Sequence, residues 1–258
     1  MRLCINAVSE CGPIREKNED MISLGGELLR DGRISTTVEF SPKENYYLLV
    51  ADGMGGHEGG ARASRMALEG WKQSFELEEI SASDFLQTAT SSIRRISQKM
   101  NILSWEEQQV RYMGTTLTGI VWMADSVWLI NSGDSRTYLM RDGCIQQISY
   151  DDEDSRGFLT NCIGAGVDTM LSVVDMTERI KEDDVILVCS DGLSDVSSDD
   201  YLEYFLLNSE HPAEDLMEWA IKQGSRDNIS IIAARVGEGN FPMVDLDEDD
   251  NGRYDAWA

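Results

Sequence analysis

Four short acidic segments, far apart in the sequence, carry the residues best suited to chemistry. They are 15–20, 52–57, 190–195 and 225–230. Within them, Asp52 and Asp191 follow the apolar runs 46–51 and 185–189, and each is followed by a glycine. An Asp-Gly pair at the end of a buried strand turns a carboxylate out of the sheet into a loop, where functional side chains are common. We therefore expect the four segments to meet at one site.

The candidate ligands in these segments are Asp20, Asp52, Asp191 and Asp227. Carboxylates gathered at one point repel one another, so such a cluster needs a cation to neutralise it. Oxygen ligands suit Mg²⁺ or Mn²⁺, whereas zinc or copper would normally recruit His or Cys. Two such ions would polarise a bridging water toward hydroxide and bind phosphoryl oxygens. The predicted reaction is metal-assisted hydrolysis of a phosphoester.

Two further side chains in the same segments suit this reaction. Arg15 offers a planar guanidinium for two phosphate oxygens, with a surface ion pair as the alternative role. His57, in a glycine-rich stretch after Asp52, is the candidate proton donor to the leaving alkoxide. Its alternative role is to hold water or backbone in a loop. His211, before Pro212 at the expected start of a helix, is interpreted as structural.

A formal net charge of −25 limits the possible partners. Nucleic acid is excluded because its phosphates would be repelled, and a phosphorylated substrate needs bound cations to reverse the local field. No apolar run of about 18 residues is present, so no membrane span is expected. Residues 1–7 become polar too soon for a signal peptide. The five cysteines form no Cys-x-x-Cys pair, which favours a reduced, cytoplasmic protein over a zinc cluster.

Apolar runs bounded by turn-forming residues predict strands at 46–51, 115–121, 127–130, 137–140, 185–189 and 229–236. Arg-Asp-Gly-Cys at 141–144 predicts a tight hairpin turn leading into 145–149. Apolar residues spaced by three and four predict helices over 61–76, 83–101 and 213–223, with Ser83 as an N-cap.

Short strands in hairpin-like succession, with helices between them, favour antiparallel sheets covered by helices over a wound βαβ fold. This places the chain in the α+β class. No repeat or linker divides it, so 1–240 is expected to be one domain, and a monomer. Residues 241–258 are strongly acidic and are expected to form a mobile tail.

The order and spacing of these motifs resemble the metal-dependent serine/threonine protein phosphatases of type 2C (PPM-type), in their bacterial form. Six stretches carry the resemblance, in the family's order and over roughly residues 10–236. They are Arg-x-x-Asn-Glu-Asp (15–20), Asp-Gly-Met-Gly-Gly-His (52–57), Gly-Thr-Thr (114–116), Gly-Asp-Ser-Arg (133–136), Ser-Asp-Gly-Leu (190–193) and Asp-Asn-Ile-Ser (227–230).

The resemblance implies a β-sandwich of two antiparallel sheets flanked by helices on both faces, with the metals at one end. It implies that Asp20 and Asp52 hold two core Mn²⁺ or Mg²⁺ ions, helped by the backbone carbonyl of Gly53. Asp191 and Asp227 would complete the core set. The implied activity is hydrolysis of phosphoserine and phosphothreonine in proteins by a metal-bridged hydroxide, without a phosphoenzyme.

Other site residues are implied in the same way. Glu19 would act through a metal-bound water, and Asp134 would join Asp191 at a third, weaker metal site. Arg15 would bind the phosphate. His57 matches the histidine often proposed as the general acid of the family.

One stretch departs from the family pattern. Bacterial members usually continue after the 141–144 turn through an Asp-His pair and a helical flap. Here 148–154 leads almost at once to 158–164, the Asp-His pair is absent and the flap is shortened. We therefore expect a more open cleft. Two alternative functions remain open: a non-catalytic pseudophosphatase that binds a signalling partner, and a phosphatase for a small phosphorylated metabolite.

Overall fold

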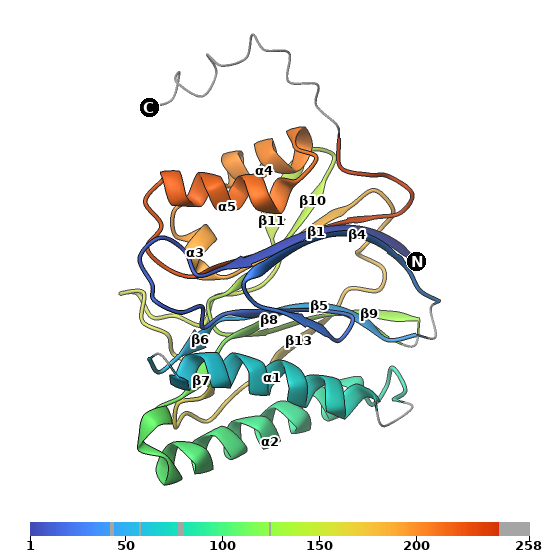
Figure 1. Cartoon of the computed structure of the whole chain (residues 1–258). Helices are drawn as coiled ribbons and strands as arrows, with labels where there is room; N and C mark the ends of the chain where they lie inside the picture. Colours follow the sequence, from blue (N-terminus) through green and yellow to red (C-terminus); the bar gives the residue numbers. More distant parts are fainter. Residues whose placement is uncertain (42–43, 57, 77–79, 124, 243–258) are drawn as a thin grey trace.

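Two six-stranded antiparallel sheets pack face to face in this computed structural model, and helices cover the outer face of each sheet (Figure 1). The structure describes residues 1–41, 44–56, 58–76, 80–123 and 125–242. The layers follow the order helix, sheet, sheet, helix (Figure 1). This arrangement confirms the predicted α+β sandwich.

The first sheet has the strand order β11-β10-β14-β15-β1-β4. Its strands are β1 (Arg2–Glu10), β4 (Gly32–Glu39), β10 (Arg136–Arg141), β11 (Cys144–Gln147), β14 (Val185–Cys189) and β15 (Ile229–Val236). β14 and β15 are buried along almost their whole length, because both of their faces are covered. This double coverage explains why their sequences are nearly uninterrupted apolar runs.

The second sheet has the strand order β13-β9-β8-β5-β2-β3. Its strands are β2 (Met21–Leu24), β3 (Glu27–Leu29), β5 (Tyr46–Ala51), β8 (Leu117–Met123), β9 (Ser126–Ser132) and β13 (Ser172–Asp175). A small third sheet, ordered β12-β7-β6, is formed by β6 (Gly53–Met54), β7 (Gly114–Thr115) and β12 (Ile163–Gly164).

Helices complete the outer layers. The second sheet is covered by α1 (Glu58–Glu76) and α2 (Phe85–Glu106). The first sheet is covered by α3 (Asp191–Ser194), α4 (Asp199–Asn208) and α5 (Pro212–Lys222). A short 3-10 helix, η1, spans Gln108–Val110. Apolar side chains fill all three interfaces between the layers. Between α1 and α2, for example, the buried ring of Trp71 packs against Phe75 and Phe85. The predicted apolar stripes therefore serve as core contacts.

Some elements differ from the sequence-based expectations. β1, β4 and α4 were not predicted. The prediction of Ser83 as an N-cap was wrong, because α2 begins at Phe85 and Asp84 precedes it. The Ser83 hydroxyl instead hydrogen-bonds to Ser81 at 2.8 Å.

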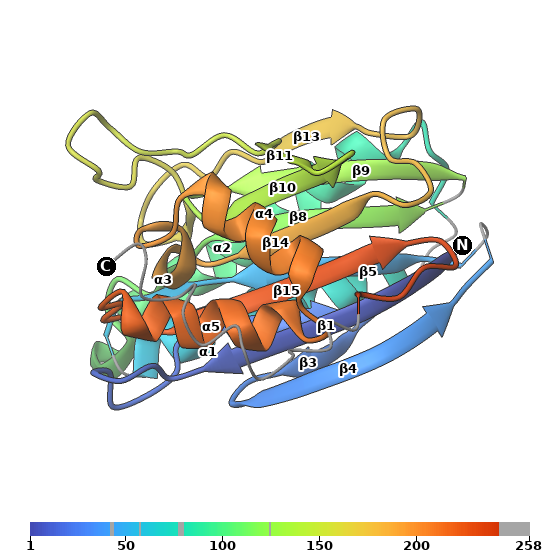
Figure 2. The same cartoon turned by 90° about the horizontal axis from the view of Figure 1, so that it is seen from above.

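The predicted hairpin between β10 and β11 is confirmed. Asp142 and Gly143 have φ values of 51° and 78°, the left-handed pair that a two-residue hairpin turn requires. After β11, residues 148–162 form an irregular loop, and the fully described stretch from 148 to 184 contains no helix. In Figure 2 this yellow-green loop extends past the strand ends on the same side as α3.

The tail prediction falls almost wholly outside the described residues, which end at 242. The described helices include none with the length and apolar character needed to cross a membrane.

Candidate active site

The four predicted aspartates come from both sheets and meet at one end of the sandwich. Asp20 immediately precedes β2 and Asp52 immediately follows β5, its antiparallel neighbour in the second sheet. Asp191 comes just after β14 and opens α3, while Asp227 precedes β15, the neighbour of β14 in the first sheet. The labels α3 and β6 mark this end in Figure 1. Antiparallel pairing therefore explains how four distant segments reach one site.

Asp20 lies at the centre of this cluster. Its side chain is fully buried, and its Oδ2 accepts a hydrogen bond of 2.8 Å from the hydroxyl of Ser190. Its backbone carbonyl accepts another, of 2.7 Å, from Nε of Arg30. Burial raises the pKa of Asp20 to about 6, and the negative charge of Asp227 adds to the rise although nearby hydroxyls oppose it. The other oxygen, Oδ1, is buried without a hydrogen-bond partner.

The pKa values of Asp191 and Asp52 are raised by the same two causes, burial and neighbouring negative charge. Burial, followed by the charges of Asp227 and Asp20, raises the pKa of Asp191 to about 7. Burial, followed by the charges of Asp20 and Asp191, also raises the pKa of Asp52 well above its usual value. Each carboxylate is thus harder to ionise because the others are close. The predicted convergence of the four aspartates is present in the fold.

The backbone of Gly53 packs closely against the backbone of Glu19. A Cβ added to Gly53 would be 2.2 Å from the carbonyl oxygen of Gly60 and 2.5 Å from that of Glu19, so only glycine fits. The Glu19 carboxylate lies beside Gly60, where an added Cβ would be 1.9 Å from Oε2. The Glu19 amide donates a hydrogen bond of 2.9 Å to Oδ1 of Asn228. This packing places the Gly53 backbone next to the Glu19-Asp20 segment.

Asp134 follows β9, in the loop before β10. Burial raises its pKa to about 6, with further contributions from the charges of Asp151, Asp195 and Glu153. Arg136, at the start of β10, pairs with Asp151 at 2.7 Å. That ion pair attaches the irregular loop 148–162 to β10. Asp134 therefore lies on the side of the site bordered by this loop.

Of the two residues predicted to contact the substrate, Arg15 and His57, the structure describes only Arg15. Arg15 lies beside Asp227 and donates a charged hydrogen bond to its Oδ2, so its guanidinium sits at the edge of the aspartate cluster. His57 lies outside the described residues. His211 precedes α5 and its Nδ1 lies 3.4 Å from the hydroxyl of Ser35, in keeping with a structural role.

The donor chemistry of this cluster fits a hard divalent cation. Within the described ranges, no three His, Cys, Asp or Glu side chains already converge tightly enough to hold an ion. However, Oδ1 of Asp20 and Oδ1 of Asp191 are buried without partners. Each such unsatisfied oxygen costs about 1–3 kcal/mol. A cation would neutralise the cluster, satisfy these oxygens and lower the raised pKa values.

Several supporting residues were missed from the sequence. The amide of Asn228 donates to the carbonyls of Cys11 and Lys17, at 2.8 and 3.0 Å, and so holds the loop before β2 in place. The hydroxyl of Thr116 accepts a hydrogen bond of 2.9 Å from the amide of Asp52. Both residues belong to the quoted motifs, so their positions gave a signal, but their partners come from other parts of the chain.

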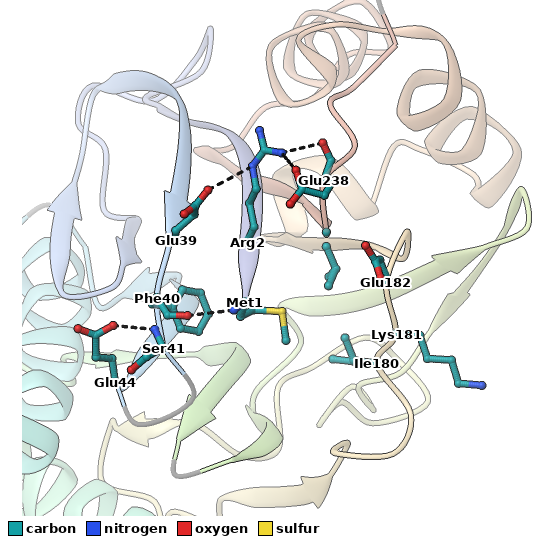
Figure 3. Close-up of a pocket in the computed structure, with 12 residues that line it drawn as sticks. Met1, Arg2, Glu39, Phe40, Ser41, Glu44, Ile180, Lys181, Glu182 and Glu238 are labelled. Carbon is teal, nitrogen blue, oxygen red and sulfur yellow. Dashed lines mark hydrogen bonds and ion pairs between the residues drawn. The ribbon is translucent and has the colours of Figure 1, made fainter.

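A separate cavity of about 630 Å³ opens at the other end of the sandwich. It lies between the far ends of β1, β4 and β15, and no predicted site residue lines it (Figure 3). Arg2 is neutralised there by Glu238 at 2.7 Å and Glu39 at 3.9 Å. The Met1 ammonium donates to the carbonyl of Phe40 at 3.0 Å. The Arg2 guanidinium and the Met1 ammonium are therefore already paired with groups of this chain.

Comparison with known proteins identifies a family of similar proteins. A family model described as Protein phosphatase 2C matches residues 36–226. The serine/threonine protein phosphatase PstP of Mycobacterium tuberculosis is 29% identical over 257 residues, which cover 91% of this chain but only 45% of that protein. The chain thus spans less than half the length of this relative. The serine/threonine phosphatase stp of Listeria monocytogenes is 27% identical over 218 residues, covering 75% of this chain and 86% of that protein.

Solved structures agree with the sequence matches. The crystal structure of Mycobacterium tuberculosis PstP superposes with a TM-score of 0.73 at 27% identity, covering 92% of this chain and 100% of that one. A PstP catalytic domain in complex with two manganese ions has a TM-score of 0.71 at 28% identity, covering 92% and 99%. The family model covers well over half of the sequence. This chain belongs to the protein phosphatase 2C family.

Proposed function

We propose that this protein is a Mn²⁺- or Mg²⁺-dependent phosphatase that hydrolyses phosphoserine and phosphothreonine in proteins. The observation that carries the proposal is the meeting of Asp20, Asp52, Asp191 and Asp227 at one end of the sandwich. The raised pKa values of Asp20, Asp52 and Asp191 and the unsatisfied oxygens of Asp20 and Asp191 match a site built for cations. The family membership and the two manganese ions in the related PstP structure add independent support.

The residues that would hold two core ions are these four aspartates and the backbone carbonyl of Gly53. Glu19 would act through a water, and Asp134 would join Asp191 at a third ion. When bound, the ions supply Lewis acidity that activates a water molecule and stabilises charge on the phosphoryl oxygens.

The chain's own groups would handle the substrate. The guanidinium of Arg15, about half exposed and next to Asp227, would bind two phosphoryl oxygens and orient the phosphoester. His57 would donate a proton to the leaving serine or threonine oxygen. Direct hydrolysis is favoured over a phosphocysteine because Cys189 is fully buried, and burial raises its pKa to about 12.

We further propose a monomeric protein that acts on phosphoproteins in the cytoplasm. All five cysteines are free, and two of them are buried, as expected where thiols stay reduced. The high negative charge disfavours nucleic-acid partners.

The decisive experiment compares phosphothreonine and phosphoserine peptides with small phosphorylated metabolites, with and without Mn²⁺ or Mg²⁺. We expect peptide turnover that EDTA abolishes and added Mn²⁺ restores. Asp191→Asn and Asp227→Asn should each lose turnover by at least about a hundredfold while keeping native circular dichroism. The exposed substitution Asp168→Asn is the matched control.

Four outcomes would contradict the proposal. Turnover of metabolites without peptides would indicate a metabolite phosphatase. Metal-independent turnover, or full activity in Asp191→Asn, would remove the aspartate cluster from the mechanism. Tight phosphopeptide binding without any turnover would indicate a pseudophosphatase.

A further inference from the structure

A second cavity, of about 400 Å³, lies directly beside the aspartate cluster. It is formed by the loop before β2, the end of β3, the start of α1 and η1. Its charged lining consists of the cations Lys17, Arg30, Arg62 and Arg65 and the carboxylates Glu58 and Glu107. Four positive charges against two negative ones make this a locally basic surface on a chain whose net charge is −25.

Arg30 supplies the inner wall of this cavity. Its guanidinium donates to the carbonyls of Asp20 and Ala61 and to the hydroxyl of Ser64, at 2.7, 2.8 and 2.7 Å. These acceptors are neutral, and the negative charges of Asp20, Asp31 and Glu19 offset the guanidinium only in part, because its pKa is still lowered. Burial, followed by the positive charge of Arg65, lowers the pKa of Arg30. Two guanidiniums held near each other repel, and an anion between them would relieve that repulsion.

The other cations differ in their ion pairs and in their exposure. Arg62 pairs with Glu107 at 2.6 Å, and both side chains are 38% exposed. Arg65 pairs with Glu69 at 3.4 Å within α1, and both of these side chains are about half exposed. The Arg62 pair is bidentate, since Nη2 of Arg62 also lies 3.3 Å from Oε1 of Glu107. The longer, exposed Arg65 pair contributes little to stability, so the Arg65 guanidinium can turn to a ligand at small cost. Lys17 is exposed at the mouth of the cavity.

The position of the cavity relates it to the reaction. Lys17 is two residues before Glu19 in the same loop, and Arg30 contacts the backbone of Asp20 itself. An extended peptide advances about 3.3–3.6 Å per residue. A substrate chain that runs from the aspartates along the loop before β2 would carry its neighbouring side chains past this surface.

We propose that this cavity is a substrate subsite for a second anionic group, located a few residues from the one that is dephosphorylated. The group is a carboxylate or a further phosphate on the same polypeptide. The inference rests on the proposed phosphatase function and adds a substrate class, namely phosphorylated segments rich in negative charge. It also explains how an acidic protein retains acidic substrates, because the basic surface offsets the repulsion locally.

The test uses one phosphothreonine peptide in four forms and measures kcat/KM with Mn²⁺ present. The flanking residues are neutral, acidic on the N-terminal side, acidic on the C-terminal side, or neutral with one added phosphoserine. We expect at least one anionic form to be preferred over the neutral form by about tenfold, and this ratio to fall as salt is raised. Preference for acidic flanks identifies a carboxylate as the ligand, whereas preference for the added phosphoserine alone identifies a phosphate.

A double variant assigns this preference to the cavity. Lys17→Gln with Arg65→Gln should bring the ratio of anionic to neutral kcat/KM close to one. The charge-matched control, Lys99→Gln with Lys181→Gln, removes exposed cations from α2 and from the opposite end of the sandwich, and should keep the wild-type ratio.

Equal kcat/KM for all four peptides, or a ratio that survives the Lys17/Arg65 substitutions, would overturn the subsite while leaving the phosphatase function intact. Absence of metal-dependent hydrolysis for every peptide would overturn the phosphatase function, and this inference with it.

Discussion

The hydroxyl of Ser190 donates a hydrogen bond of 2.8 Å to Oδ2 of Asp20, joining two residues that are 170 positions apart. Ser190 follows β14 of the first sheet, whereas Asp20 precedes β2 of the second. The same hydroxyl accepts a hydrogen bond of 3.0 Å from the amide of Ser230. One serine therefore fixes the orientation of a central carboxylate and connects the two halves of the site.

Ser190→Ala should weaken Mn²⁺ binding by about tenfold to a hundredfold, the usual cost of removing a group that orients a ligand. Without the hydroxyl the pKa of Asp20 rises further, so protons compete better with the metal. Titration calorimetry at about pH 7 measures the affinity directly. Ser197→Ala is the control, because the Ser197 hydroxyl is also buried but has no hydrogen-bond partner. Equal affinities for the two variants would show that the Ser190 bond does not orient Asp20.

The metal-free protein should lose stability as pH rises from about 4 to 7. Asp20 and Asp191 have pKa values of about 6 and about 7 when folded, against about 4 when unfolded. At a pH between the unfolded and the folded pKa, only the folded state retains the protons. Protonation therefore stabilises the folded state at the acidic end, and this stabilisation is lost as the pH rises through the folded pKa values. For Asp20 alone the loss is on the order of 3 kcal/mol.

Urea denaturation in EDTA at about pH 5 and about pH 7.5 measures this loss. Asp20→Asn removes one titrating group, so its free energy of unfolding should depend less on pH than that of the wild type. Saturating Mn²⁺ should stabilise the wild type more at the higher pH, where the carboxylates are ionised. An identical pH dependence in Asp20→Asn would assign the effect to the overall negative charge instead.

Gly53→Ala should damage both stability and metal binding. The new Cβ would lie 2.2 and 2.5 Å from two backbone oxygens, which cannot move without displacing Glu19. Such overpacking typically costs about 1–3 kcal/mol. Gly59→Ala is the matched control: its Cβ would meet the nearest atom at 3.5 Å, and alanine is the better residue within α1. Thermal melts with and without Mn²⁺ compare the two, and a Gly53→Ala protein as stable as Gly59→Ala would refute the close packing.

Arg15→Lys should raise KM for a phosphopeptide by about tenfold, with a smaller change in kcat. Lysine keeps the charge beside Asp227 but loses the planar pair of donors that fits two phosphoryl oxygens. Arg226→Lys, an exposed change in the segment before β15, should leave both parameters unchanged. If Arg15→Lys lowers kcat alone, the guanidinium acts mainly through Asp227.

The sequence predicted strands best where a strand is covered on both faces. β5, β14 and β15 are largely apolar and were correctly located. β1 was missed because it contains buried polar residues such as Asn6, which is 2% exposed. Asn6 is satisfied by hydrogen bonds to the Ser35 hydroxyl and the Ala213 amide, at 2.8 Å each. A polar residue reads as a strand-breaking signal until its distant partners are known.

The site residues, too, were predictable only where the signal lies in the local sequence. Aspartates next to strand ends were recognisable because residue type and position both point to function. Their supports were not, since the contacts of Ser190 and Arg30 with the Asp20 segment exist only after the sheets stack. The shortened flap was visible as missing residues, and the irregular loop at 148–162 agrees with it.

Because half of the carboxylates sit on each sheet, the spacing of the site is set by how the two sheets stack. A change deep in the sandwich, such as Ile120→Val in the core between the two sheets, would alter the packing between the layers without replacing a site residue. Any sliding of one layer over the other is transmitted to all four acids together. We therefore expect ion affinity to depend on how the two sheets are aligned. Substitutions in the core between the sheets should then change activity as well.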